Sequence, residues 1–533
     1  MSELRWWQRG IVYQVYPRSF QDSNGDGIGD LKGIVSRLDY FQWLGIDAIW
    51  ISPIYPSPMA DFGYDVADYC DVDPIFGSLA DFDVLIHEAH GRGLRVILDF
   101  VPNHTSDRHP WFVESRASRN NPKRDWYIWH DAAPGGGPPN NWMSNFGGNA
   151  WEWDPATQQY YYHGFLKQQP DLNWRNPDVR QAMYNILRFW LRRGIDGFRV
   201  DVIWHLIKDD QFRDNPVNPG YRPEDSEIRQ FLQIYSADRP EVHALIAEMR
   251  DVIDEFDDRL LIGEIYLPVE RLVTYYGEGL KGAHLPFNFQ LIGAPWNAQS
   301  IFRLIAEYER ALPHGGWPNW VLSNHDQKRI ASRIGIQQAR IAAMLLLTLR
   351  GTPTLYYGDE IGLEGVAIPP EDVQDPWERN EPGLGVGRDP SRTPMQWNSS
   401  PNAGFTTARP WLPVAENFAR YNVENLKADP SAILQLYRRL IELRRNNPCL
   451  SVGGYREVGV SKTVLSYGRA GEGMEMFVAL NFAHTEGTVK LPPWIYPPGL
   501  VLNSYLDERL ECSQDCVILR SNEGVILRRR TSH

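Results

Sequence analysis

The sequence predicts an α/β protein built on a (β/α)8 TIM barrel, with one domain inserted after the third strand and an antiparallel β-domain at the C-terminal end. Two observations support this prediction. Short apolar runs alternate with amphipathic helical stretches along most of the chain, which is the pattern of parallel βαβ units. Several of these runs end in acidic residues, and the C-terminal strand ends are where barrel enzymes have their active sites.

The apolar runs give eight strand candidates in chain order: residues 11–17, 48–53, 95–104, 197–202, 260–264, 283–289, 320–326 and 354–360. Helical periodicity predicts helices at 31–44, 79–93, 177–193 and 432–445. From residue 451 onward, short alternating segments are separated by turn residues, which is typical of antiparallel strands. We therefore assign 1–104 and 173–450 to the barrel, 105–172 to the inserted domain and 451–533 to a C-terminal β-sandwich domain.

The overall composition excludes some classes of partner. A formal net charge of −13 disfavours nucleic acid, and apolar runs such as 341–349 are too short to span a bilayer. The N-terminal residues lack the apolar core of a signal peptide, and the four cysteines are too few and too scattered for a disulfide framework. We expect a cytoplasmic enzyme with a small-molecule substrate and no membrane or nucleic-acid partner, as a monomer or homodimer.

Three carboxylates follow predicted barrel strands: Asp201 after the fourth, Glu264 after the fifth and Asp326 after the seventh. Cleavage of a glycosidic bond needs one protonated acid and one ionised carboxylate. Arg199 shares a strand face with Asp201 and should keep it ionised, whereas the apolar strand before Glu264 should raise the pKa of that acid. A retaining enzyme would hold these two carboxyls about 5 Å apart. A single such acid is more often a helix cap, but three on one barrel face favour catalysis.

The loop from residue 22 to residue 30 alternates oxygen-bearing side chains with glycines, which suits a hard cation such as Ca²⁺ or Mg²⁺. It is not an EF-hand, because the twelfth position lacks the required glutamate. A glycine-rich turn with solvated acids is the alternative. His104 and His325 also follow predicted strands. Each could be a satisfied core histidine, but their position beside acids favours contact with ligand hydroxyls.

The chain resembles glycoside hydrolase family 13, the α-amylase family, and particularly its α-glucosidase and oligo-1,6-glucosidase members. The resemblance rests on four ordered motifs at 99–104, 197–201, 263–264 and 324–326. It implies that Asp201 is the nucleophile, Glu264 the general acid/base and Asp326 the transition-state stabiliser. It further implies a substrate site made by Asp61, Tyr64, His104, Phe146, Phe165, Arg199, Val202, His325 and Arg388. Within that set Asp61 would close the pocket, and the two phenylalanines would come from the inserted domain.

The same resemblance implies a structural Ca²⁺ or Mg²⁺ ion and no organic cofactor, with side-chain ligands and one carbonyl, from Asp22, Asn24, Asp26, Ile28 and Asp30. We expect a retaining, exo-acting α-glucosidase acting on short α-linked gluco-oligosaccharides, with some transglucosylation. Val202 after the nucleophile tilts the expectation toward α-1,6 linkages, although one methyl group is worth only about 1–3 kcal/mol of discrimination. A sucrose- or trehalose-acting transglucosylase is an alternative. A catalytically dead barrel is disfavoured by the three intact acids.

Overall fold

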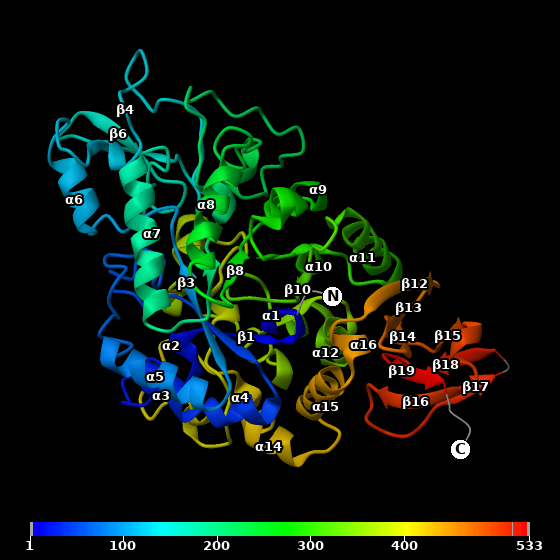
Figure 1. Ribbon diagram of the computed structural model, residues 1–533. Helices are drawn as coiled ribbons and strands as arrows, with labels where there is room; N and C mark the ends of the chain where they lie inside the picture. The colour runs from blue at the N-terminus through cyan, green and yellow to red at the C-terminus, as the bar shows by residue number, and fades with distance from the viewer. Residues whose placement is uncertain (1–3, 514, 530–533) are drawn as a thin grey trace.

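The computed structural model describes residues 4–513 and 515–529 (Figure 1). Within these residues, eight parallel strands lie in the order β10-β11-β1-β2-β3-β7-β8-β9. A parallel bridge between Asn288 and Trp320 joins the two ends of this sheet and closes it. The predicted (β/α)8 barrel is therefore confirmed. Its strands are β1 (Val12–Val15), β2 (Ala48–Ile51), β3 (Arg95–Phe100), β7 (Gly197–Val200), β8 (Leu260–Gly263), β9 (Leu285–Pro286), β10 (Asn319–Val321) and β11 (Thr352–Tyr356).

The longer helices lie outside the barrel. Helices occupy all four predicted stretches, and three further long helices, Val242–Asp254, Ala298–Ala311 and Ile330–Thr348, were not predicted. The predicted helix 31–44 breaks at Arg37, whose backbone leaves the helical region (φ −112°, ψ 6°). The longer helices are α3 (Leu31–Ser36), α4 (Leu38–Leu44), α5 (Leu79–Gly91), α7 (Pro177–Arg192), α8 (Val242–Asp254), α11 (Ala298–Ala311), α12 (Ile330–Thr348) and α15 (Ile433–Asn446). Shorter ones are α1 (Trp6–Arg9), α2 (Pro17–Phe20), α9 (Val269–Leu272), α10 (Gln290–Gly293), α13 (Pro376–Asn380), α14 (Val423–Ala428) and α16 (Pro448–Ser451).

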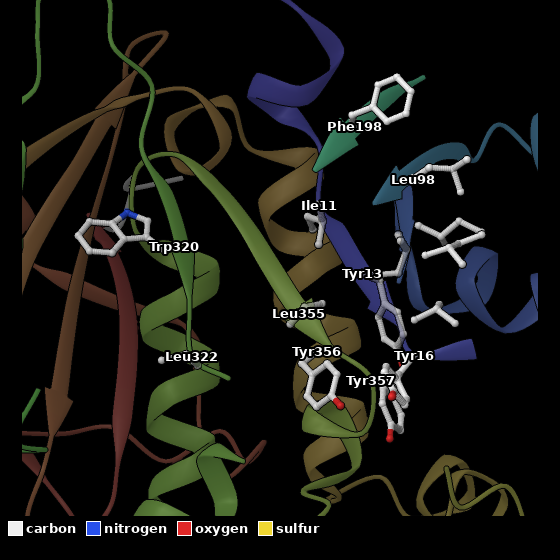
Figure 2. Close-up of a cluster of buried hydrophobic side chains, with 14 of the residues drawn as sticks. Ile11, Tyr13, Tyr16, Leu98, Phe198, Trp320, Leu322, Leu355, Tyr356 and Tyr357 are labelled. Atoms are coloured by element: carbon white, nitrogen blue, oxygen red, sulfur yellow. The ribbon is translucent and has the colours of Figure 1, made fainter. Parts of the chain in front are cut away.

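The alternation of side chains along the strands separates two apolar layers. Leu98 and Phe198 belong to the large core between the strands and the helices, together with Trp320 and Leu355 (Figure 2). Their strand neighbours point the other way, so Ile97 packs inside the barrel. The period of two then directs Asp99 and Arg199 to the inner side as well. The barrel thereby carries charged groups inward at its C-terminal end.

The inserted segment forms a small layer of its own at the top of the molecule in the view of Figure 1. It contains α6 (Pro110–Ala117) and an antiparallel sheet in the order β4-β6-β5, made of β4 (Trp129–His130), β5 (Trp151–Asp154) and β6 (Gln159–Tyr162). Trp142, Trp151 and Tyr162 are buried against one another and give this layer its own small core. An antiparallel bridge between His104 and Asp171 ties its end to the end of β3. The insertion thus overhangs the mouth of the barrel.

The C-terminal segment is antiparallel, as predicted, and lies on the opposite side of the barrel from the insertion (Figure 1). One sheet, β12-β13-β14-β19-β16, faces a second sheet, β15-β18-β17, across a shared apolar core. The strands are β12 (Gly454–Val460), β13 (Val464–Gly471), β14 (Met474–Asn481), β15 (Gly487–Lys490), β16 (Pro498–Asn503), β17 (Glu511–Ser513), β18 (Cys516–Leu519) and β19 (Gly524–Arg529). Among the described helices, none combines the length and the apolar character needed to cross a bilayer.

Candidate active site

A pocket of about 440 Å³ opens at the C-terminal mouth of the barrel. The ends of β7 and β8, the inserted domain and the loops around residues 218–233 and 377–388 all contribute to its wall. Ten of the twelve residues predicted for catalysis and substrate binding line it: Asp61, Tyr64, His104, Phe146, Phe165, Asp201, Val202, Glu264, Asp326 and Arg388. Residues that are more than 300 positions apart in the sequence therefore meet in one cavity.

Arg199 lies at the base of this pocket and is completely buried. Its Nη1 donates to Asp99 Oδ1 at 2.7 Å and to Asp201 Oδ1 at 2.8 Å. Its Nη2 lies 2.8 Å from Glu264 Oε2. The sequence predicted Arg199 as the partner that keeps Asp201 ionised. In the structure one guanidinium is shared by three acids, because three neighbouring strands end around it.

Burial raises the pKa of both Asp201 and Glu264. For Asp201, the charges of the neighbouring carboxylates add to the effect of burial, and Arg199 opposes it. Burial likewise raises the pKa of Asp99 to about 7 despite its contact with Arg199. Several buried carboxyls around one cation do not all ionise together, so this group retains a proton near neutral pH. Acid-catalysed glycosidic cleavage requires one protonated acid beside one ionised carboxylate.

Val202 has an unusual backbone for a β-branched residue, with φ 35° and ψ 45° in the left-handed region. Such a conformation costs of the order of 1–3 kcal/mol and is kept where the surroundings enforce it. Here it directs the Val202 N–H to Glu264 Oε2 at 2.8 Å. The strained residue therefore fixes the orientation of the Glu264 carboxyl.

Asp326 has a different electrostatic environment from the other two acids. Arg392 Nη2 donates to Asp326 Oδ1 at 2.8 Å, and Arg388 Nη1 lies 3.3 Å from the same oxygen. Burial acts to raise the pKa of Asp326, but His325 and the surrounding arginines outweigh it and hold the pKa below its usual range. Asp326 is therefore ionised at neutral pH.

His325 lies directly behind Asp326. Gln14 Nε2 is 2.8 Å from its Nδ1, and the Tyr64 hydroxyl is 2.7 Å from its Nε2. The rings of Tyr64 and His325 stack at 5.3 Å, and burial lowers the pKa of His325 well below its ordinary value. His325 and Arg199 are the two predicted site residues behind the pocket wall, in contact with the acids. Direct contact of these two with substrate stays a prediction.

One end of the pocket is closed by an ion-pair chain. Arg388 Nη2 lies 2.7 Å from Asp61 Oδ1 and 2.6 Å from Asp375 Oδ1, and its guanidinium covers the Phe146 ring at 4.7 Å. His104 lies at the same end, and burial lowers its pKa to about 4, so that its imidazole is neutral. The closed end therefore offers charged and neutral hydrogen-bonding groups beside an aromatic wall, which suits a terminal sugar ring.

Several contributing residues were not singled out from the sequence. Asp99, Asp375 and Arg392 position Arg199, Arg388 and Asp326, respectively, through the contacts described above. Asp99 is the first residue of the motif 99–104, and Arg392 lies four positions after the predicted site residue Arg388, so the sequence carried a signal for these two. The wall formed by residues 218–233 had no comparable motif.

The predicted cation loop is held by its own side chains. Asp22 accepts the backbone N–H groups of Asn24, Gly25 and Gly27, and Asp30 caps α3 by accepting the N–H of Gly33 at 2.7 Å. The donor atoms are all oxygen, which is the ligand type Ca²⁺ takes. In the described part of the chain, however, no three His, Cys, Asp or Glu side chains are grouped as metal ligands. The cation stays a prediction from donor chemistry.

The barrel, the mouth pocket and its carboxyls define a glycoside hydrolase. The family model for the α-amylase catalytic domain matches residues 14–453, so the chain belongs to the α-amylase family. It is 44% identical over 503 residues to a probable α-glucosidase of Rhizobium meliloti (strain 1021), covering 91% of each chain. It is 38% identical to an oligo-1,6-glucosidase of Parageobacillus thermoglucosidasius, covering 96% of this chain and 97% of that one.

Solved structures of related enzymes are also similar to this chain over nearly its whole length. The α-glucosyl transfer enzyme XgtA superimposes with a TM-score of 0.94 at 39% identity, covering 98% of this chain and 99% of that one. The trehalulose synthase MutB superimposes with a TM-score of 0.92 at 36% identity, covering 98% of this chain and 100% of that one. The relatives thus include enzymes named for hydrolysis and enzymes named for glucosyl transfer.

Proposed function

We propose that this chain is an exo-acting, retaining α-glucosidase that releases α-glucose from the non-reducing end of short α-glucosides. The observation that carries the proposal is the pocket closed at one end by the Asp61–Arg388 ion pair, with three acids around its inner part. A closed end admits a terminal sugar and excludes the middle of a polymer. The proposed roles are nucleophile for Asp201, acid/base for Glu264 and stabiliser for Asp326.

The reaction proceeds in two displacements. Asp201 attacks the anomeric carbon while Glu264 gives its proton to the glycosidic oxygen, which leaves with the rest of the substrate. Glu264 then takes a proton from a water molecule that attacks the same carbon and releases the sugar from Asp201. Asp326 is ionised and held by Arg388 and Arg392, so it stabilises the positive charge of the oxocarbenium-like transition state.

The glucosyl group is transferred instead of hydrolysed if an alcohol, in place of the water molecule, attacks the sugar bonded to Asp201. Names such as α-glucosyl transfer enzyme and trehalulose synthase among the structural relatives support transfer as a second candidate activity, with sucrose as one donor to examine. For linkage, the Val202 N–H donates to Glu264 Oε2 and Val202 lines the pocket, so we expect its side chain to lie beside the bond to be cleaved. We propose a preference for α-1,6 over α-1,4 bonds of about tenfold, the scale that one pocket methyl group supports.

The test is a set of initial rates on maltose, isomaltose, sucrose and trehalose, with the products separated and identified. We expect free glucose first formed as the α-anomer, faster release from isomaltose than from maltose, and transfer products at high substrate concentration. Glu264→Gln should lower kcat by at least about a thousandfold, within the range for a general acid. β-Glucose as the first product would contradict the retaining mechanism, and full activity of Glu264→Gln would contradict the acid/base role.

A further inference from the structure

A second cavity lies outside the barrel, where α4, α14 and α15 pack together near the lower edge of the view of Figure 1. Its volume is about 280 Å³, and the described residues that line it are different from those of the mouth pocket. Tyr40 and Trp397 form a buried aromatic floor, with their rings edge to face at 5.3 Å. The Trp397 indole N–H also donates to the Phe20 carbonyl oxygen at 2.8 Å. The floor of this cavity is therefore fixed by packing and by hydrogen bonding.

Three cationic side chains stand over the aromatic rings of this cavity and of the surface beside it. The Arg37 guanidinium lies 4.1 Å from the centre of the Trp397 ring. The Lys427 ammonium lies 4.2 Å from the centre of the Trp43 ring, and the Arg438 guanidinium lies 4.8 Å from the centre of the same ring. These contacts are attractive because the face of an aromatic ring carries partial negative charge. They hold the cations in place and leave N–H groups free to donate hydrogen bonds.

The break in the helical backbone at Arg37 accounts for the position of the first cation. Arg37 is the residue between the end of α3 and the start of α4. Its Nε and Nη2 both donate to Gln21 Oε1, at 2.8 Å and 2.5 Å. Gln21 is itself held, because its Nε2 donates to the Phe405 carbonyl oxygen at 2.8 Å. One face and one edge of the Arg37 guanidinium are therefore occupied, whereas Nη1 has no protein partner in the described chain and is available to a ligand.

The three cations have no acidic partners. Within residues 4–513 and 515–529, neither Arg37, Lys427 nor Arg438 forms an ion pair with a carboxylate. Glu424 also lines the cavity, but its side chain is exposed and, in the same part of the chain, makes no ion pair with Lys427. Burial lowers the pKa of Lys427, and the charges of Arg37 and Arg438 lower it further. The positive charges therefore repel one another, and a bound anion would relieve that repulsion.

We propose that this cavity is a binding site for an oxyanion of the phosphate type, either inorganic phosphate or the phosphate group of a monoester. Lys427 provides a compact positive charge, and Arg37 and Arg438 provide planar N–H donors, which are the groups that bind phosphate oxygens in proteins. The three cations supply donors only, so the site suits a ligand that brings acceptors and negative charge. It differs in this respect from the mouth pocket, where carboxylates lie around the substrate. The site does not depend on the proposed glucosidase function.

The test is isothermal titration calorimetry of the full chain with inorganic phosphate and with methyl phosphate, in a chloride buffer of constant ionic strength. We expect one site with a dissociation constant of about 1 mM or tighter, the affinity that two charge-assisted hydrogen bonds support. Tighter binding of methyl phosphate would identify a monoester as the ligand, and tighter binding of inorganic phosphate would identify the free ion. Lys427→Gln and Arg438→Gln should each weaken binding by about tenfold or more, whereas Lys427→Arg should retain it.

Arg439→Gln is the matched control, since it removes the same charge from the next residue of α15, which is exposed and does not line the cavity. A second readout is amide hydrogen exchange, which phosphate should slow in α14 of the wild type and not in Lys427→Gln. The absence of binding heat at ten times the expected dissociation constant would overturn the proposal. So would binding that Lys427→Gln and Arg438→Gln leave unchanged, or that Arg439→Gln weakens equally. Glucose release from maltose is unaffected by any of these outcomes, so the proposed function is tested separately.

Discussion

At the scale of single residues, the chemistry depends on how one buried cation is shared. Arg199 contacts Asp99, Asp201 and Glu264, so its charge is divided among three acids. Asp326 has two arginines of its own, Arg388 and Arg392. The arrangement separates the acids into a group that keeps a proton and a single carboxylate that stays ionised. This is the division that a protonated acid and a charge stabiliser need.

The shared proton makes a prediction about stability and pH. Because burial raises the pKa of Glu264 in the folded state, that state binds more protons than the unfolded chain above the ordinary carboxyl range. The contribution of Glu264 to the free energy of unfolding is therefore present at low pH and is lost as the pH rises through the raised pKa of Glu264. Glu264→Gln removes this loss. The melting temperature of Glu264→Gln minus that of the wild type should therefore be a few degrees larger at pH 8 than at pH 5, as measured by differential scanning calorimetry.

The control is Glu307→Gln, which makes the same substitution at an exposed acid on α11. If Glu264→Gln gave the same difference at pH 5 and pH 8, the raised pKa of Glu264 would be wrong. The activity loss expected for the same variant would be unaffected, so the electrostatic and catalytic assignments are tested separately.

At the scale of strands and helices, the sequence predicted those features that a local pattern of apolar residues determines. All eight barrel strands were located from apolar runs, and the period of two placed Arg199 on the same face as Asp201. The predicted strands extend past the observed ends because the polar residues that follow leave the sheet to build the site. Helix 31–44 was predicted as one unit because its apolar period continues across Arg37, where the backbone turns out of the helix.

Contacts between distant segments could not be predicted in this way. Glu381 holds Ser226 across 155 sequence positions, and Arg392 reaches Asp326 across 66. Neither contact leaves a local pattern, since each depends on how separate loops meet over the barrel mouth. The predicted strand ends indicated the three acids, and the resemblance to a known family added their separate roles and the closed end of the pocket. It gave no indication of the wall formed by residues 218–233.

The loop from Asp22 to Asp30 carries the prediction of a structural cation. We propose Ca²⁺ there, with side-chain oxygens of Asp22, Asn24, Asp26 and Asp30 and the Ile28 carbonyl as ligands. At a calcium concentration 100 times the dissociation constant, binding to the folded state alone adds about 2.7 kcal/mol. The melting temperature should then be several degrees higher in 1 mM CaCl2 than in EDTA. Asp26→Ala should abolish that difference, and equal melting temperatures for the wild type in both buffers would contradict the proposal.

At the scale of the whole molecule, buried arginines lie where the barrel meets the C-terminal domain. Arg469, on β13, donates to the carbonyl oxygens of Thr348, Gly453 and Gly454. Arg444, on α15, donates within the barrel to carbonyl oxygens at the end of α12 and just before β11, and it also reaches the Ser451 carbonyl oxygen at the domain boundary. Burial lowers the pKa of Arg469 to about 10 and that of Arg444 to about 9. In the described chain neither arginine forms an ion pair, so each serves to bind backbone at the junction.

This junction predicts that the C-terminal domain stabilises the barrel without acting in catalysis. Arg469→Met keeps much of the side-chain volume but leaves the buried carbonyl oxygens of Thr348 and Gly453 without their donor, at a cost of about 1–3 kcal/mol for each group left unpaired. We expect a melting temperature lower by several degrees and a separate early transition in calorimetry, as the two domains uncouple. The value of kcat/KM on maltose at 25 °C should stay within about twofold, because the pocket lies at the other face.

Arg456→Met, on the exposed strand β12, is the control. An unchanged melting temperature in Arg469→Met would show that the junction does not depend on this arginine.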